Sequence, residues 1–166
     1  MSTITFKGKA VQTNNHLPDV GESFSDFILV DGSLNDVSLS HFGKKKKILN
    51  IFPSLDTDVC AASVRAFHEK LKGRNDVVVL NISMDLPFAQ RRFCTTEGLD
   101  HVVTLSAFRS SFPTDHGLMM VDGPLTGLCS RVAFVLDENN KIIYKELVPE
   151  ITQEPDYASV VAALEP

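Results

Sequence analysis

The sequence lacks the features that mark membrane-bound, nucleic-acid-binding and exported proteins. No apolar run approaches the roughly 20 residues that a membrane-spanning helix needs, so we expect no membrane partner. Acidic residues outnumber basic ones, 21 to 16, for a formal net charge of −5, which argues against a nucleic-acid partner. The first fifteen residues contain neither an apolar signal core nor a small-residue cleavage pattern, and we therefore expect a cytoplasmic protein.

The motifs of metal and nucleotide sites are also missing. The five histidines show no metal-ligand spacing, there is no C-x-x-C pair, and "GPLTG" fits no nucleotide fingerprint. We expect neither a metal nor a cofactor. Three cysteines in 166 residues are too few for a disulfide scaffold, so each is expected to be buried, metal-binding or reactive.

The patterning that is present predicts a single domain over residues 1–166 with an apolar content of 43%. The expected elements are, in order, a hairpin in "ITFKGKAVQT", a short strand at Phe27–Val30, a buried strand in "KKILNIFP", a helix over Asp58–Leu71, a strand in "DVVVLNIS", a helix from about Pro87 that stops before Gly98, a strand in "HVVTLS", a loop-rich stretch over Phe108–Gly127, two strands in "RVAFVLDENNKIIYKELV", and a last helix opened by Pro155.

This order predicts an α/β protein with a thioredoxin-like fold, in which helices flank a central mixed β-sheet and an N-terminal β-hairpin precedes it. The run Lys44–Lys47 lies directly before the apolar stretch that starts at Ile48. We interpret it as a solvated lead-in to that strand.

Cys60 is placed where a thiolate would be stabilised. It falls in the first turn of the helix that follows a buried strand, where unpaired N–H groups and the positive end of the helix dipole lie. Asp58 can cap this helix, Thr57 is one turn from the sulfur, and Pro53 shields the loop. Because unpaired cysteines are also among the most buried residue types, these residues alone leave a reactive Cys60 and a structural Cys60 both open.

Further motifs carry a resemblance to a known family. Pro53, Thr57 and Cys60 match the Pro-x-x-x-Thr-x-x-Cys signature of peroxiredoxins. The stretches "FPSLDTDVCAAS", "SMDLPFAQRRFC" and "DGPLTGL" resemble one branch, the thiol peroxidases or atypical two-cysteine peroxiredoxins. The similarity continues to "VPEITQEPDYASVVAAL" and covers essentially the whole chain.

The resemblance implies a cofactor-free, thioredoxin-dependent peroxidase. Cys60 would be the peroxidatic cysteine, which hydrogen peroxide or an organic hydroperoxide oxidises to a sulfenic acid, and Cys94 would be the resolving cysteine, which closes an intramolecular disulfide. Arg131 would stabilise the thiolate and the charge on the peroxide oxygens, which Thr57 and the Cys60 N–H would help to hold. Family members form homodimers and favour alkyl and lipid hydroperoxides, so both properties are expected here.

The remaining candidates have a structural and a functional interpretation. Cys129 is interpreted as a small buried filler, with a bystander thiol as the alternative. The apolar set Phe108, Phe112, Leu118, Met119 and Met120 is either core beneath a long loop or an apolar rim at the active-site entrance.

Two other functions stay open at this point. A redox sensor or holdase would use the same disulfide as a switch and would turn over little. A cysteine hydrolase would need a histidine beside Cys60, but His68 lies two turns along the helix and off the Cys60 face. The hydrolase is therefore poorly supported.

Overall fold

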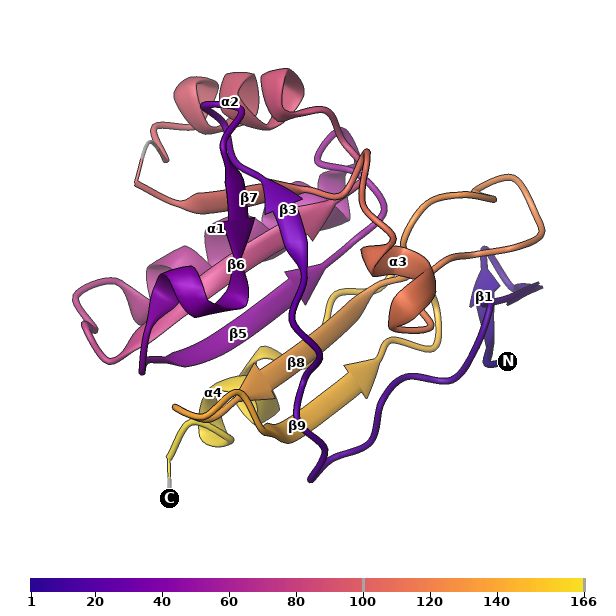
Figure 1. The fold of residues 1–166 in the computed structure, drawn as a ribbon. Helices are drawn as coiled ribbons and strands as arrows, with labels where there is room; N and C mark the ends of the chain where they lie inside the picture. The colour runs from indigo at the N-terminus through magenta and orange to yellow at the C-terminus, as the bar shows by residue number, and fades with distance from the viewer. Residues whose placement is uncertain (100, 166) are drawn as a thin grey trace.

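The computed structural model describes residues 1–99 and 101–165, in which seven strands form one twisted sheet with the order β4-β3-β7-β6-β5-β8-β9 (Figure 1). The centre is parallel: β5 (Lys46–Ile51) pairs with β6 (Val77–Ser83), which pairs with β7 (Val103–Ser106). The edges are antiparallel and comprise β8 (Val132–Leu136), β9 (Ile142–Leu147), β3 (Ile28–Val30) and β4 (Asp36–Ser38).

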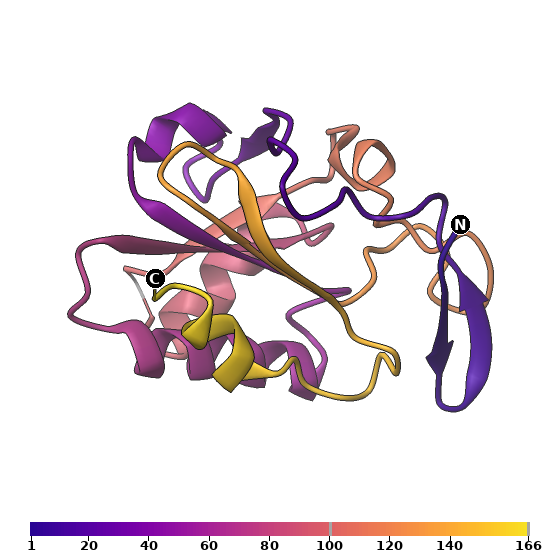
Figure 2. The same cartoon turned by 90° about the horizontal axis from the view of Figure 1, so that it is seen from below.

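Helices cover both faces of the sheet (Figure 2). The helix α1 (Asp58–Leu71) lies beside α4 (Tyr157–Ala162) on one face, and the short η1 (Leu39–Phe42) and α3 (Phe112–Asp115) lie on the other. The helix α2 (Pro87–Thr96) connects β6 to β7. Neighbouring strand residues point to opposite faces: Ile48 packs with α1 and α4, whereas Leu49 joins the larger core on the other side.

A separate two-stranded hairpin precedes the sheet. It consists of β1 (Thr3–Phe6) and β2 (Lys9–Gln12), joined by Lys7 and Gly8, both of which have positive φ. The hairpin packs against the end of the chain because Thr5 N–H donates to the Pro149 carbonyl at 2.8 Å and Ile151 N–H donates to the Thr5 carbonyl at 2.9 Å.

The structure confirms the thioredoxin-like fold, the mixed sheet and the N-terminal hairpin. The expected range of α1 agrees with the observed one, while α4 begins two residues after Pro155. The sequence patterns did not reveal β4, η1 or α3, since elements of three or four residues are too short to show a period. No helix in the described part of the chain has the length and apolar content to cross a bilayer.

The interpretation of Lys44–Lys47 as a solvated lead-in is wrong for Lys47. Its side chain is fully buried, and its Nζ donates to the carbonyls of Gly43 at 2.9 Å and Lys45 at 3.0 Å and to Asn140 Oδ1 at 2.7 Å. Burial lowers the pKa of the ammonium group. These three acceptors offset the cost of removing the charge from water, so the buried lysine ties the start of β5 to the β8–β9 turn.

Candidate active site

Cys60 lies in the first turn of α1 and is fully buried. It packs in a small apolar cluster with Phe52, Leu55, Val64 and Leu99. The cap of this helix differs from the expectation: Thr57, and not Asp58, is the N-cap, and its hydroxyl accepts a hydrogen bond from Cys60 N–H at 3.3 Å. Thr57 takes this role because it has extended φ/ψ one residue before the helix, where a side-chain oxygen can turn back to the third residue.

Arg131 is in direct contact with the Cys60 sulfur. Its Nη1 donates to Cys60 Sγ at 3.3 Å, and its Nε donates to the Ile151 carbonyl at 2.9 Å. The side chain is only 2% exposed. A guanidinium stays positively charged and has a planar set of donors, so a buried cation lies in direct contact with the Cys60 sulfur.

Strand pairing accounts for this contact. In the antiparallel pair of β5 and β8, Ile51 lies opposite Val132, so the residue that precedes β8 reaches the loop that follows β5. That loop leads directly into α1 and Cys60. Residues 71 positions apart in sequence are thereby brought to one place at the end of the sheet.

The first turn of α1 is also tied to the sheet by buried polar groups. The Ser63 hydroxyl donates to the Cys60 carbonyl at 2.7 Å and accepts from Asn50 Nδ2 at 3.1 Å. Asn50 Nδ2 also donates to Asn81 Oδ1 at 2.9 Å. The sequence analysis assigned no role to these residues, although Ser63 lies within the quoted stretch "FPSLDTDVCAAS". They hold the helix start in place because buried polar groups are costly to separate.

A cavity of about 420 Å³ lies in front of this site. Pro53, Thr57 and Arg131 line it, as expected of site residues, together with the apolar side chains Phe6, Leu125, Leu128 and Ile151. Cys60 is not among the described residues that line it, so Arg131 and Thr57 stand between the sulfur and the opening. We call these four apolar side chains the apolar mouth of the cavity. They come from segments that the sequence analysis did not propose as a rim, although Leu125 and Leu128 belong to the quoted motif "DGPLTGL".

Of the two interpretations of this apolar set, core packing is right for most of its members, and none of the five lines the cavity in front of Cys60. Phe112 and Leu118 are fully buried in the main core, and Met120 is buried in a second cluster beneath the hairpin. Phe108 is 39% exposed but lies outside the cavity in front of Cys60. Hydrophobicity alone could not separate a rim from a core in this loop-rich region.

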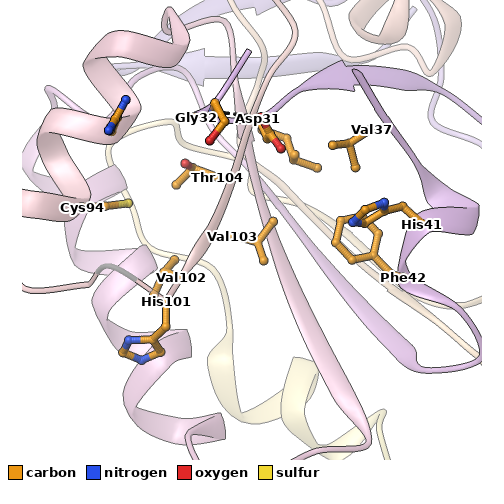
Figure 3. A pocket seen from close by; sticks show the side chains of 13 residues that line it. Asp31, Gly32, Val37, His41, Phe42, Cys94, His101, Val102, Val103 and Thr104 are labelled. Atoms are coloured by element: carbon orange, nitrogen blue, oxygen red, sulfur yellow. Dashed lines mark hydrogen bonds between the residues drawn. The ribbon is translucent and has the colours of Figure 1, made fainter. Parts of the chain in front are cut away.

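Cys94 lies on α2 and lines a different cavity, also of about 420 Å³, which its sulfur faces (Figure 3). The two cavities have no lining residue in common. The neighbouring Phe93 instead packs against the apolar cluster around Cys60. Consecutive helix residues point about 100° apart, so α2 presents Phe93 toward Cys60 and directs Cys94 elsewhere. The structure therefore brings Cys60, Thr57, Pro53 and Arg131 together but leaves Cys94 outside this group.

Cys129 is fully buried in the main core, as expected of a filler. Burial, with a smaller contribution from the charge of Asp85, raises the pKa of its thiol to about 12. At neutral pH the Cys129 side chain is a thiol and not a nucleophile.

Comparisons with known proteins agree on the family of the chain. The family model described as Redoxin matches residues 17–161. A thiol peroxidase from Corynebacterium glutamicum is 47% identical over 164 residues, which cover 99% of this chain and 99% of that protein. This alignment therefore leaves no large segment of either protein unmatched.

Solved structures show the same relationship at the level of the fold. A peroxiredoxin-like protein from Aquifex aeolicus has a TM-score of 0.94 and 33% identity, covering 99% of this chain and 96% of that one. A thiol peroxidase from Chromobacterium violaceum has a TM-score of 0.90 at 22% identity, covering 98% and 95%. At that identity the second comparison supports the fold alone.

Proposed function

The chain belongs to the Redoxin family as a peroxiredoxin enzyme of the thiol peroxidase type, and on that premise we propose that Cys60 is its peroxidatic cysteine and Cys94 its resolving cysteine. The observation that carries the first assignment is the buried Arg131, whose Nη1 lies 3.3 Å from Cys60 Sγ at the start of α1. A cation and a helix N-terminus act on one sulfur, and both stabilise negative charge on a nucleophile at that place.

In the first step, the Cys60 thiolate attacks the terminal oxygen of a hydroperoxide, ROOH. The S–O bond forms and the O–O bond breaks, which gives Cys60–SOH and RO⁻, and RO⁻ takes a proton from solvent. Arg131 stabilises the charge that moves onto the leaving oxygen. The Cys60 N–H donates to the Thr57 hydroxyl at 3.3 Å, which is a long hydrogen bond. A peroxide oxygen can replace it and bond to both groups, which supports their proposed role in orienting the substrate.

In the second step, the Cys94 thiol attacks the sulfenic acid, which yields the Cys60–Cys94 disulfide and one water. A disulfide requires Cα atoms about 4.4–6.8 Å apart with their side chains facing each other. Cys94 faces the cavity shown in Figure 3, so α2 has to unwind or rotate before the bond can form. Thioredoxin then supplies two electrons and two protons and restores both thiols.

The lining of the Cys60 cavity supports organic hydroperoxides as substrates alongside hydrogen peroxide. Phe6, Leu125, Leu128 and Ile151 offer apolar contact to an alkyl group, while Arg131 contacts the peroxide end. We further propose a homodimer and a reaction without a cofactor, as the family resemblance implies, and a single cytoplasmic domain, as the chain length and the N-terminal sequence suggest. The packing of the N-terminal hairpin against residues 149–151 supports the single domain.

A coupled assay with thioredoxin, thioredoxin reductase and an organic hydroperoxide tests the cycle. We expect sustained turnover that Cys60→Ser abolishes, that Cys94→Ser reduces to a single oxidation of Cys60, and that Cys129→Ser leaves intact. Peptide mapping after one equivalent of hydroperoxide should give a Cys60–Cys94 peptide. A Cys60–Cys129 peptide would overturn the assignment of Cys94, and oxidation without sustained turnover would contradict thioredoxin as the reductant.

A further inference from the structure

One carboxylate links the loop that precedes Cys60 to the segment that leads into α2, the helix of Cys94. Asp85 lies between the end of β6 and the start of α2, the helix of Cys94. Its Oδ1 accepts from the Ser54 hydroxyl at 2.7 Å, and its Oδ2 accepts from Leu55 N–H at 2.8 Å and from the Ser83 hydroxyl at 2.6 Å. Ser54 and Leu55 belong to the loop that precedes Cys60, so Asp85 bridges that loop and the base of α2.

On the Cys60 side, the hydrogen bonds continue to the reactive residue. The Ser54 carbonyl accepts from Thr57 N–H at 3.2 Å and from the Thr57 hydroxyl at 3.1 Å. The Thr57 hydroxyl in turn accepts from Cys60 N–H at 3.3 Å. Asp85 thus holds Ser54, Ser54 holds Thr57, and Thr57 caps the helix turn that presents Cys60.

On the Cys94 side, the hydrogen bonds continue into α2. The Ser83 hydroxyl, which donates to Asp85, accepts from Gln90 Nε2 at 3.2 Å. Gln90 lies one helical turn before Cys94 and also donates to the Leu105 carbonyl at 3.0 Å. Gln90 Oε1 is buried without a hydrogen-bond partner among the described residues. An unsatisfied buried acceptor gains hydrogen bonds when it reaches water, so α2 is held less firmly than α1, whose start is tied to Asn50 and Asn81.

The two chemical steps make opposite demands on these contacts. Attack on the hydroperoxide requires a fixed loop, with Thr57 and Arg131 in place around Cys60. Disulfide formation requires the loop and α2 to separate from their present contacts so that Cys94 can reach Cys60. The Asp85 carboxylate bonds to the Cys60 loop directly and to α2 through Ser83 and Gln90, so it favours the first arrangement and opposes the second.

We propose that Asp85 is a positioning residue that holds the Cys60 loop and α2 in the attacking arrangement and thereby sets the balance between peroxide attack and disulfide formation. The proposal rests on the Cys60 and Cys94 roles proposed above. The proposal also bears on overoxidation. A Cys60 sulfenic acid that has not yet formed the disulfide with Cys94 can react with a second hydroperoxide, Cys60–SOH + ROOH giving Cys60–SO₂H + ROH. The hydrogen bonds at Asp85 slow disulfide formation and thereby lengthen the lifetime of the Cys60 sulfenic acid.

The test is Asp85→Asn, which keeps the shape of the side chain but replaces one acceptor oxygen with an NH₂ donor facing Ser54 or Leu55. The loss of charged hydrogen bonds is expected to lower the rate constant for Cys60 oxidation by about tenfold. The conversion of sulfenic acid to disulfide should become faster, and the fraction of sulfinic acid at high hydroperoxide should fall. Rapid-quench intact-mass measurements give both rates. Asp56→Asn is the matched control, since Asp56 is an exposed carboxylate in the same loop and should leave both rates unchanged.

The direction of the two rates separates positioning from a general structural role. If both rates fall together, or if neither changes, the proposal is overturned. If Asp85→Asn does not fold, Ser54→Ala removes the bond to Oδ1, together with the bond that the Ser54 hydroxyl accepts from the exposed Asp56 N–H at 3.1 Å, and leaves the bonds to Oδ2 in place. It should show the same opposed changes at smaller size. The wild-type chain is the reference for the cycle itself. If its Cys60–Cys94 disulfide does not form, the proposed function is contradicted. If the wild type forms the disulfide but the variants do not show slower Cys60 oxidation together with faster disulfide formation, only the role of Asp85 is contradicted.

Discussion

At the scale of single residues, the guanidinium of Arg131 makes two contacts that no other cationic side chain could combine. One nitrogen reaches Cys60 Sγ and another reaches the Ile151 carbonyl, both in a buried position. The second bond fixes the plane of the guanidinium, so the first is pre-oriented and costs little reorganisation during the reaction. The site therefore depends on the shape of the side chain as well as on its charge.

Replacing Arg131 with Lys should lower the rate of Cys60 oxidation by about 100-fold, because a lysine keeps the charge but cannot reproduce the two fixed bonds. Competition kinetics with a second peroxidase measure this rate directly. Arg109→Lys is the control, since Arg109 is 55% exposed and pairs with Asp36 at the surface. A rate for Arg131→Lys within about twofold of the wild type would show that charge alone suffices.

At the scale of elements, the two cysteine-bearing helices are held differently. The start of α1 is bonded through Ser63 and Asn50 to the centre of the sheet. The helix α2 is shorter and begins at Pro87 without a side-chain cap. It also contains Gln90 Oε1, which is buried and has no hydrogen-bond partner within residues 1–99 and 101–165. Local stability follows from such contacts, so we expect α2, rather than α1, to unwind when the proposed disulfide forms.

We expect amides in residues 87–97 to exchange faster in the disulfide form than in the dithiol form, while amides in residues 63–71 of α1 keep their protection. Hydrogen exchange read by mass spectrometry on both redox forms makes the comparison. The α1 peptide is the internal control. Equal protection of residues 87–97 in the two forms would refute local unwinding of α2.

The contact between the hairpin and the end of the chain should depend on pH through Glu150. Its carboxylate accepts from the N–H groups of Thr152 and Gly8 and from the hydroxyls of Thr152 and Thr5. These bonds lower the pKa of Glu150 to about 2 from 4.5. Because the folded pKa is below the unfolded one, the stabilisation is complete above pH 4.5 and is lost as the pH falls toward 2.

Urea unfolding of the wild type and of Glu150→Gln at several pH values measures this effect. The difference in free energy of unfolding between the two proteins should be constant from pH 7 to about pH 5 and should shrink as the pH falls further. Glu154→Gln provides the control, since its carboxylate lies four residues away and bonds to the Tyr157 hydroxyl rather than to the hairpin. A difference that does not change with pH would contradict the role assigned to the Glu150 carboxylate.

At the scale of the whole molecule, the site is assembled from distant parts of the chain. The hairpin supplies Phe6, the β5–α1 loop supplies Thr57, and the segments around β8 and β9 supply Arg131 and Ile151. The fold class could be predicted because long buried strands and α1 have clear periods. Cys60 could be proposed as the peroxidatic cysteine because a helix start and the family motif coincide there.

The rest of the site depends on tertiary contacts that no local pattern encodes. Phe6 lies in a hairpin whose alternation predicts a strand but not what the strand packs against. Lys47 looked solvated because its three acceptors come from a preceding loop and from Asn140, far along the chain. The direction of Cys94 away from Cys60 follows from how α2 is rotated on the sheet, which the helical period alone leaves undetermined.

The apolar mouth should matter for bulky substrates and little for small ones. We expect Phe6→Ala to lower kcat/KM for cumene hydroperoxide by roughly tenfold while changing that for hydrogen peroxide far less, because only the larger substrate has an alkyl or aryl group to contact the cavity wall. Lys9→Ala in the same hairpin is the control for hairpin stability. Equal losses with both substrates would show that Phe6 acts on the fold and not on substrate contact.

The bond from Arg131 to the Ile151 carbonyl also has a consequence for the order of events during synthesis. Cys60 leaves the ribosome while Arg131 and Ile151 are still untranslated, and at about 5–20 residues per second the interval lasts several seconds. Throughout that time the growing chain lacks the contact between Arg131 and the Cys60 sulfur. On the proposed roles of these residues, we expect rapid reaction with hydroperoxides to begin only when the C-terminal segment has emerged and docked.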